Sequence, residues 1–431
     1  MLARAGLRSI FALLTAPSRR HRLGVTFADG ETRRYFDGNG EADVAIVFRT
    51  ARAERRAFWN FYPGLFEAYV EGEVDLLGER PILKLAELGH DALGGRRSTS
   101  LGGRAVFNNP VVKMRQLAQE IRQYGLSYAR ARENAEFHYG MSPEFFEIQL
   151  GDTVGYSEGY WGEGVETLNQ AKWCGYDRAC RKLLLEPGLK VAEVGAGWGY
   201  LPIMMAKRWG CDVSIYNPVA RQNQYMRERF DRHELPNIRI LDKDHRQLAE
   251  EPETYDRYVS IGVYEHVGYF GYKAWVNSIA TALKPGGIGL LSTSGFMNRK
   301  MTEFLTLKYI FPGGHLPSLP LTLNTMDRLG LEIVDIENLW PHYQKTVACW
   351  LENVESNWER IRALDPEFFN ERFRRRWMMY LSGTTETFSN GLDCYQITFT
   401  KGRGADIYPQ TREFLYAAPV PPPEKEIEYW P

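Results

Sequence analysis

The sequence predicts an α/β protein in which a doubly wound, largely parallel sheet follows a smaller N-terminal accessory domain. Three observations support this prediction. Short apolar runs typical of buried strands alternate with helical stretches, the first of these runs leads into three closely spaced glycines, and an earlier region alternates in strand fashion between glycine turns. With 431 residues, of which 44% are apolar, the chain has enough material for two domains.

The first 22 residues contain five arginines and no acidic residue around the apolar run 10–16. This pattern favours an interfacial helix that lies on anionic lipid, with a solvated helix and a cleaved signal peptide as the alternatives. Beyond it, residues 24–36 and 42–50 predict strands that are separated by glycine-containing turns.

A segment of linker composition, residues 94–103, sets the predicted domain limits. We expect the accessory domain at residues 1–105 and the main domain at residues 106–402. The proline-rich tail at residues 403–431 is expected to lie over another surface or to be loosely ordered.

The main domain begins with helical spacing over residues 110–136, and its further elements follow in alternation. They are a helix at 168–185, a strand at 191–194, a helix at 201–208, strands at 211–216, 237–241 and 257–262, a helix end, turn and strand at 283–295, and a last strand near 392–402. This alternation is typical of a doubly wound parallel sheet.

Gly195, Gly197 and Gly199 follow Glu193 at the end of the first predicted strand. Glycines let the backbone turn sharply and approach a ligand, and the amides that begin the next helix can hold a polar group. An ordinary tight turn is the alternative. Because the spacing departs from the dinucleotide pattern GxGxxG, and because class I methyltransferases usually carry an acidic residue here, the stretch favours S-adenosylmethionine as the cofactor.

Three stretches carry a resemblance to a known family: EPGLKVAEVGAGWGYL at 186–201, DKDHR at 242–246 and YVSIGVYEHVG at 258–268. They resemble the cyclopropane-fatty-acyl-phospholipid synthase family, whose members methylate cis double bonds in membrane lipid acyl chains. The segments 64–78 and 308–319, and HYQKT at 342–346, extend the likeness over about residues 64–402. It implies a class I methyltransferase fold, a Rossmann-like sheet, and a lid at 308–319 near the acyl pocket. Gly140 and Pro143 depart from the family, which usually has an acid and an asparagine there.

The resemblance also assigns the cofactor contacts. It implies that Gln222 lies near the ribose and that Asp244 and His245 lie near the adenine of S-adenosylmethionine. At Tyr216 and Asn217, where an acidic ribose ligand is usual, ligand binding and plain packing at the strand end stay equally open. The predicted cofactor-binding residues are Glu193, Gly195, Ala196, Gly197, Trp198, Gln222, Asp244 and His245.

Methyl transfer to an alkene uses the π bond as the nucleophile and leaves a carbocation that must lose a proton. Aromatic faces can stabilise such a cation, although any aromatic cluster can equally be plain core. The candidates are Tyr156, Tyr160, Trp161, Tyr264 and Tyr343.

In the family a bound bicarbonate accepts the proton, and the matching residues here are partly replaced. The chain retains the family's residues at Glu265, in YEHVG, and at Tyr343, and these are catalytic candidates together with His266. Two other positions differ, because Glu158 stands where a cysteine is usual and Ser292 where a histidine is usual. We hypothesise that Glu158 is the base in place of bicarbonate. An ionised carboxylate about 4 Å from the cation would contribute roughly 4 kcal/mol at an effective dielectric constant near 20. Burial opposes this ionisation, and we expect a hydrogen bond from Tyr343 to support it.

The changed base leaves the product open between a methylene-branched and a cyclopropane acyl chain and slightly favours the former. For Glu158 the alternatives are a solvated loop carboxylate or an altered and inactive site. For the whole protein they are a methyltransferase for a small soluble acceptor and a nonenzymatic lipid-binding or scaffold subunit. The partners we expect are unsaturated phospholipid acyl chains and an anionic membrane surface, while a homodimer and a partner reductase stay open.

Composition excludes several other classes of function. A net charge of −1 gives no general attraction to nucleic acid, and five cysteines without a CxxC pair suggest neither a disulfide framework nor a zinc or other metal site. No apolar run reaches the length of a membrane span. We therefore expect a cytoplasmic enzyme that is peripheral at the inner membrane surface.

Overall fold

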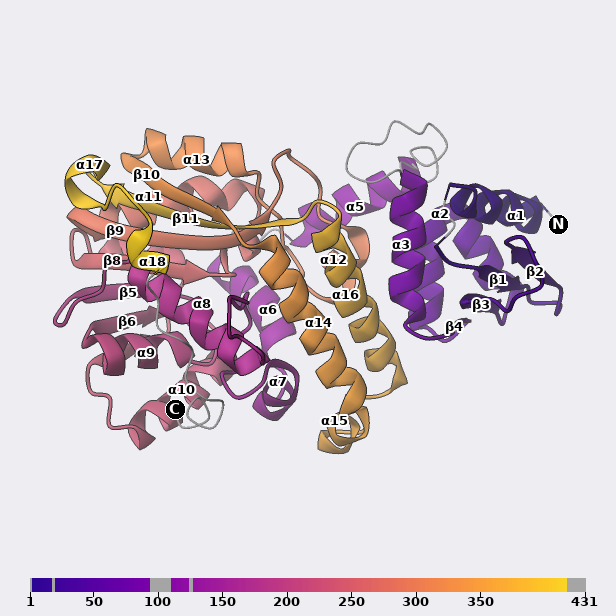
Figure 1. Cartoon of the computed structure of the whole chain (residues 1–431), viewed down its shortest axis with the longest axis horizontal. Coiled ribbons are helices and arrows are strands. Elements are labelled where there is room, and N and C mark those ends of the chain that lie inside the picture. Colours follow the sequence, from indigo (N-terminus) through magenta and orange to yellow (C-terminus); the bar gives the residue numbers. More distant parts are fainter. Residues whose placement is uncertain (1, 18–19, 94–109, 124–126, 417–431) are drawn as a thin grey trace. The chain divides into compact units, whose positions relative to one another are not determined.

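The computed structural model describes residues 2–17, 20–93, 110–123 and 127–416 (Figure 1). By its contacts the chain divides into a first compact unit, Met1–Ile121 with Glu303–Ile310 and Trp358–Gly391, and a second unit that contains the rest. The sequence did not indicate that two later segments would join the first unit. The linker at 94–103 and the boundary at 105 lie outside the described residues, and the domain limits drawn from the sequence stay predictions.

The second unit is built on a seven-stranded sheet with the order β10-β11-β9-β8-β5-β6-β7. The strands β5 to β9 run parallel to one another, and β11 lies antiparallel between β9 and β10. This confirms the predicted fold class. The strands are β5 Lys190–Val194, β6 Asp212–Tyr216, β7 Ile238–Leu241, β8 Tyr255–Ile261, β9 Leu283–Gly295, β10 Leu331–Asn338 and β11 Asp393–Lys401.

Every strand predicted for the main domain is present, and β10 is the one that the sequence analysis missed. Its sequence alternates apolar and acidic side chains, and most of its residues are only partly buried, as suits an edge strand. The helices of this unit are α6 Tyr128–Tyr139, α7 Pro143–Leu150, α8 Leu168–Lys182, α9 Tyr200–Trp209, α10 Ala220–Arg232, α11 Tyr272–Ala282, α13 Leu319–Arg328 and α14 Trp340–Ser356, with short 3₁₀ helices η2 His245–Glu250, η3 Tyr264–His266 and η4 Tyr269–Gly271.

Helices cover both faces of the sheet (Figure 1), and each face has a hydrophobic core. Successive strand residues point to opposite faces, so Val191 packs with side chains of α8, α9 and α10, and Ala192 packs with side chains of α11 and α13. This double cover explains why the parallel strands are short continuous apolar runs.

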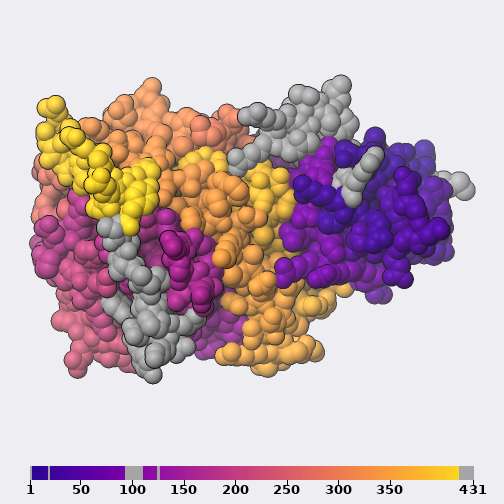
Figure 2. Space-filling view, viewed as in Figure 1, coloured from indigo at the N-terminus to yellow at the C-terminus, as the bar shows by residue number. Residues whose placement is uncertain are grey.

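The segment after β11 folds back onto the second unit as α17 Gly404–Ile407 and α18 Glu413–Tyr416 (Figure 2, yellow). Helix α18 contacts α8, and the Leu415 carbonyl accepts a hydrogen bond from Arg178 at 3.4 Å. The predicted tail therefore lies over another surface up to residue 416, and the rest of it lies outside the described residues.

The first unit combines a four-stranded sheet of order β2-β1-β3-β4 with helices. Strands β1 and β3 are the parallel pair in it. Its elements are α1 Leu2–Thr15, β1 Leu23–Thr26, β2 Thr32–Tyr35, β3 Val44–Phe48, α2 Ala51–Val70, β4 Val74–Leu77, α3 Pro81–Leu93, α12 Phe304–Tyr309, α15 Trp358–Leu364 and α16 Glu371–Ser389; helix α5 Pro110–Gln123 ends where this unit does.

Helix α1 does not have the role that its sequence suggested. Leu7, Phe11 and Leu14 are buried in the core of the first unit, so the apolar face is not free to enter lipid. Its charges are also compensated, because Arg4 pairs with Glu54 and Asp29, and Arg8 pairs with Glu31. The expected interfacial helix is therefore a core helix. Within the described residues, none of the helices has the length and apolarity that crossing a membrane requires.

Candidate active site

A cavity opens at the carboxyl ends of β5, β6 and β8, with an empty volume of about 1120 Å³ when its mouth is included. This is the edge of a doubly wound sheet where ligands bind. All of the predicted cofactor residues line it, namely Glu193, Gly195, Ala196, Gly197, Trp198, Gln222, Asp244 and His245. Of the catalytic candidates His266 lines it, whereas Glu158, Glu265 and Tyr343 lie behind its wall.

The glycine loop lines this cavity, and each of its three glycines is required for a different steric reason. Gly195, at φ +77°, has no room for a Cβ, which would lie 2.5 Å from Val263. Gly199, at φ +92°, would place a Cβ 2.9 Å from Met226. Gly197, at φ +57°, would point a Cβ into open space. The first two therefore allow close packing of the loop, and the third leaves room for a ligand.

Glu193 ends β5 and is buried beside the loop. Its Oε2 atom has no hydrogen-bond partner within the described part of the chain. Burial raises the pKa of this carboxyl group to about 8, with no opposing charge to offset it. The cavity thus contains an acidic group that a polar or cationic ligand would satisfy.

Asp244 and His245 lie at the start of η2, and both line the cavity. Burial would raise the pKa of Asp244, but the hydrogen bonds and the charge of Arg246 help to lower it. Burial lowers the pKa of His245 to about 4, so the imidazole is neutral at pH 7. Its ring packs 4.3 Å from Trp275, and its buried Nε2 has no partner in the described residues.

Tyr216 and Asn217 also line the cavity, and their polar groups are engaged within the protein. The Tyr216 hydroxyl lies 3.0 Å from that of Tyr255, and the Asn217 amide donates to Gln222 at 3.3 Å and to Asn223 at 2.8 Å. These bonds fix the end of β6 and orient Gln222 at the cavity wall.

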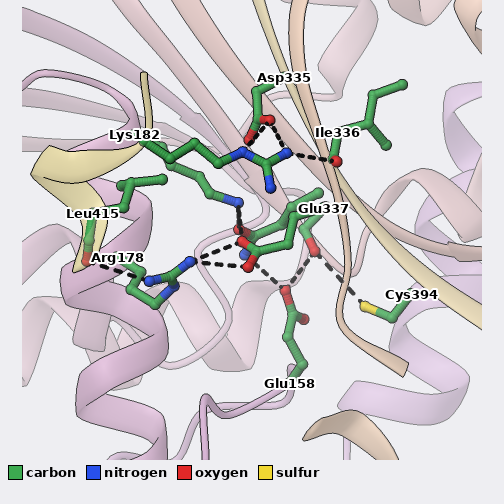
Figure 3. A network of polar contacts seen from close by, with 11 residues as sticks. Glu158, Arg178, Lys182, Asp335, Ile336, Glu337, Cys394 and Leu415 are labelled. Carbon is green, nitrogen blue, oxygen red and sulfur yellow. Dashed lines mark hydrogen bonds and ion pairs between the residues drawn. The ribbon is translucent and has the colours of Figure 1, made fainter. Parts of the chain in front are cut away.

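Behind the cavity wall, the Glu158 carboxylate accepts two hydrogen bonds at its Oε1 atom (Figure 3). Ser292 donates its hydroxyl at 2.5 Å and Gln396 donates its amide at 3.1 Å. The donor expected from the sequence, Tyr343, is not one of them, and its ring packs against Trp350 at 5.8 Å. The replaced family positions, 158 and 292, are thus in direct contact.

Glu265 lies close enough to Glu158 for their charges to interact. Its Oε1 accepts the backbone N–H of Ser294 at 2.5 Å, and its buried Oε2 has no partner among the described residues. Burial, with a smaller contribution from the charge of Glu158, raises the pKa of Glu265 to about 7. The charge of Glu158 thus acts together with burial against ionisation of Glu265.

The aromatic candidates divide between the cavity and the core. Tyr156 lines the cavity and stacks on Trp350 at 5.0 Å. The others lie elsewhere: Tyr160 stacks on His342, Trp161 donates to Thr346, Tyr264 lies in the core beside α11, and Tyr343 packs on Trp350.

Sequence reasoning missed a second aromatic group at the cavity. Tyr139 lines it and bonds His266 at 3.0 Å, while Phe311, from the predicted lid, lies 4.1 Å from His138 and 5.2 Å from His266. Burial lowers the pKa of His266 to about 4, so this ring too is neutral at pH 7. No spacing in the sequence singled out Tyr139.

A fully buried lysine was also missed. Lys172 of α8 donates to the Ser157 carbonyl at 2.7 Å, to the Ser157 hydroxyl at 2.6 Å and to the Glu158 carbonyl at 3.3 Å. Burial lowers its pKa to about 7, although the charge of Glu158 acts in the opposite direction. In the sequence Lys172 is one more polar residue in an amphipathic helix, and nothing marks it as buried.

Comparison with known proteins places this geometry in context. The family model for mycolic acid cyclopropane synthetase matches residues 127–397. A probable fatty acid methyltransferase of Pseudomonas putida is 32% identical over 66% of this chain and 73% of its own length. The cyclopropane-fatty-acyl-phospholipid synthase of Escherichia coli K12 is 31% identical over 62% of this chain and 67% of its own.

Among solved structures, mycolic acid cyclopropane synthase CmaA1 in complex with SAH and CTAB resembles the chain with a TM-score of 0.58. It is 29% identical to this chain, and the match covers 63% of this chain and 98% of that one.

The neutral, buried Glu193 predicts a pH-dependent stability. From about pH 4.5 to pH 8 the unfolded chain ionises this carboxyl group and the folded chain does not, so the free energy of unfolding falls as pH rises. We expect Glu193→Gln to be more stable than the native protein at pH 8 by about 4 kcal/mol and equal to it at pH 4. Urea denaturation of the ligand-free protein at both pH values measures this. An equal difference at both would contradict a neutral Glu193.

Proposed function

The chain belongs to the mycolic acid cyclopropane synthetase family, and from this premise we propose that it transfers a methyl group from S-adenosylmethionine to the cis double bond of an unsaturated phospholipid acyl chain. The observation that carries the proposal is the cavity at the glycine loop, which every predicted cofactor residue lines. The proposed setting is the inner membrane surface, since the acyl chain must leave a bilayer to react.

The residues around the cavity fit the cofactor. Gly197 leaves open space where any other residue would place a Cβ. Two buried polar atoms that face this region, Glu193 Oε2 and His245 Nε2, have no partner in the described residues, and a ligand with an ammonium group and an adenine could satisfy both. Glu193 would then hold the amino acid end, and Asp244 with His245 the base.

When bound, S-adenosylmethionine supplies an electrophilic methyl group on a sulfonium centre. Addition of that methyl to the double bond leaves a positive charge on the acyl chain, and the chain must then lose a proton. Tyr156 and Tyr139 offer aromatic faces at the cavity that can stabilise the cation. The neutral ring of His266 adds no like charge there.

The proposed proton acceptor is Glu158. It follows Ser157, which lines the cavity, and its side chain is buried behind that wall. Ser292 and Gln396 both donate to Oε1, and Oε2 has no hydrogen bond among the described residues. A carboxylate of the protein would thus do what the carboxylate of bicarbonate does in relatives that bind that ion.

Both candidate products lose a proton from the transferred methyl group. If proton loss comes first, the C–H electron pair closes a cyclopropane on the cationic carbon. If a hydride first moves from the methyl-bearing carbon to the cationic carbon, the C–H pair then forms an exocyclic methylene double bond. The product depends on whether the base removes the proton before or after the hydride shift. We propose that Glu158, as a fixed base, removes it after the shift, which gives the methylene-branched product. The change at positions 158 and 292 is our reason for this choice.

Mass spectrometry of acyl chains after incubation with methyl-labelled S-adenosylmethionine and oleoyl phospholipid vesicles tests the function. We expect a labelled gain of CH₂ with a retained double bond. A labelled cyclopropane ring would support the proposed methyl transfer but would show that the product is a cyclopropane and not a methylene-branched chain. No label in any chain would instead favour a small soluble acceptor, or a nonenzymatic subunit if the cofactor is not consumed.

The same assay tests the base. Glu158→Gln should lower turnover at least about 100-fold, because the amide cannot accept the proton, and should leave the dissociation constant of S-adenosylmethionine within about twofold. Calorimetry measures the latter. The matched control is Glu163→Gln, which removes an exposed carboxylate from the same loop and should change neither quantity. Near-normal turnover of Glu158→Gln would exclude Glu158 as the base.

The role of Gly197 gives a second variant. We expect Gly197→Ala to weaken binding of S-adenosylmethionine at least about tenfold, because the new methyl group enters the ligand space. The left-handed backbone adds a stability cost of about 1 kcal/mol. Gly188→Ala is the control, since Gly188 has φ +84°, the same open surroundings and no place at the cavity. Equal affinities for the two variants would contradict the proposed cofactor position.

A further inference from the structure

A row of polar side chains crosses the sheet next to Glu158. Ser292 of β9, Gln396 of β11 and Glu337 of β10 are register partners on three adjacent strands, so they lie on the same face of the sheet. Ser292 and Gln396 are almost wholly buried, and both donate to Oε1 of Glu158. Helix α8 covers this face and adds two cations to it, Lys182 and Arg178 (Figure 3).

The row is a continuous path of hydrogen bonds. Lys182, which is fully buried, donates to Gln396 Oε1 at 2.7 Å and to Glu337 Oε2 at 2.6 Å. Arg178 donates to the two oxygens of Glu337 at 2.9 and 3.1 Å. The path therefore links the carboxylate of Glu158 to an ion-paired cluster through one side chain, Gln396 (Figure 3).

The direction of these bonds follows from the chemistry of the groups. A lysine ammonium only donates, so the amide oxygen of Gln396 must face Lys182. The amide nitrogen then faces Glu158, and because it too only donates, Oε1 of Glu158 must accept. The hydroxyl of Ser292 donates to the same oxygen. This arrangement requires an unprotonated Oε1 and leaves Oε2 available.

The cluster at the other end of this path is ion-paired, because Arg178 and Lys182 both pair with Glu337. Burial would raise the pKa of Glu337, but Lys182 and Arg178 outweigh it and lower that pKa. Burial lowers the pKa of Lys182, and the charge of Glu337 opposes that shift.

Four other titratable groups face Glu158. Burial raises the pKa values of Cys394 and Tyr176, so both are neutral at pH 7. Lys172 and Glu265 have pKa values of about 7 each, and they change charge near neutrality. Any pH profile of the enzyme includes these two, so the contribution of the row has to be read from differences between variants.

We propose that Gln396 and Lys182 are positioning residues for the proton acceptor: Lys182 fixes the amide of Gln396, and Gln396 holds Oε1 of Glu158 and leaves Oε2 to take the proton. This inference rests on the proposed function of Glu158 as the base. None of the row's side chains lines the cavity, so its effect on turnover is separable from cofactor binding.

Two single variants test the positioning role. Gln396→Leu removes the amide at similar volume, and Lys182→Met removes the ammonium and keeps the stem. We expect each to lower kcat at pH 7 at least about tenfold, to move the acidic limb of the kcat profile to higher pH by about one unit, and to leave the dissociation constant of S-adenosylmethionine and the KM for vesicles within about twofold. Gln396→Leu alters no charge, so it remains informative if Lys182→Met does not fold.

The double variant tests the order of the path. If Lys182 acts only through Gln396, removing Lys182 has no further effect once Gln396 is gone. The double variant should therefore have the same kcat as Gln396→Leu alone. The control is Arg229→Met, which removes another buried cation of the second unit, on helix α10 and not on α8. It should leave the acidic limb in place even if it lowers the melting temperature. Independent, multiplying effects of the two substitutions would overturn the proposed order.

The failure of this inference differs from the failure of the proposed function. If Glu158→Gln keeps its turnover, the assignment of the base fails and this inference fails with it. If Glu158→Gln is inactive while Gln396→Leu keeps the native kcat and the native acidic limb, the positioning role alone is overturned.

Discussion

The need to compensate buried carboxylates constrains the polar interior of the second unit more than any other interaction. A carboxylate that loses its hydration needs protein donors in its place, or it stays protonated. Glu265 receives one backbone donor and has a pKa of about 7, and Glu193 receives none from the described residues and has a pKa of about 8. Glu158 receives two side-chain donors from the sheet itself.

The topology of the sheet supplies those donors. Strand β11 runs antiparallel between β9 and β10, which brings Ser292, Gln396 and Glu337 into one row although they come from distant parts of the sequence. Helix α8 then adds Lys182 over the same face. The antiparallel end of this sheet thus carries the polar row, while its parallel part carries the glycine loop and the cavity.

The sequence predicted the features that depend on residues close together in the chain, and it missed those that depend on residues far apart in the chain. The glycine loop and the residues that follow each parallel strand are local features, and the rule that strand ends share one edge of the sheet brings them together. The partnership of Gln396 with Glu158 spans 238 residues and depends on strand register, which no local pattern reveals. Helix α1 was misread for a related reason, because its apolar face is equally suited to lipid and to the core that buries it.

The contact between Glu158 and Ser292 bears on whether the altered site is active. Two independent losses from a decaying site would leave unrelated residues at these positions, and a buried glutamate without donors would be costly. Here the serine donates to the glutamate at 2.5 Å, and the register partner of that serine, Gln396, donates to the same oxygen. This contact is what the proposal of a site built around a carboxylate requires, since the two positions that the resemblance marks as changed are hydrogen-bonded to each other.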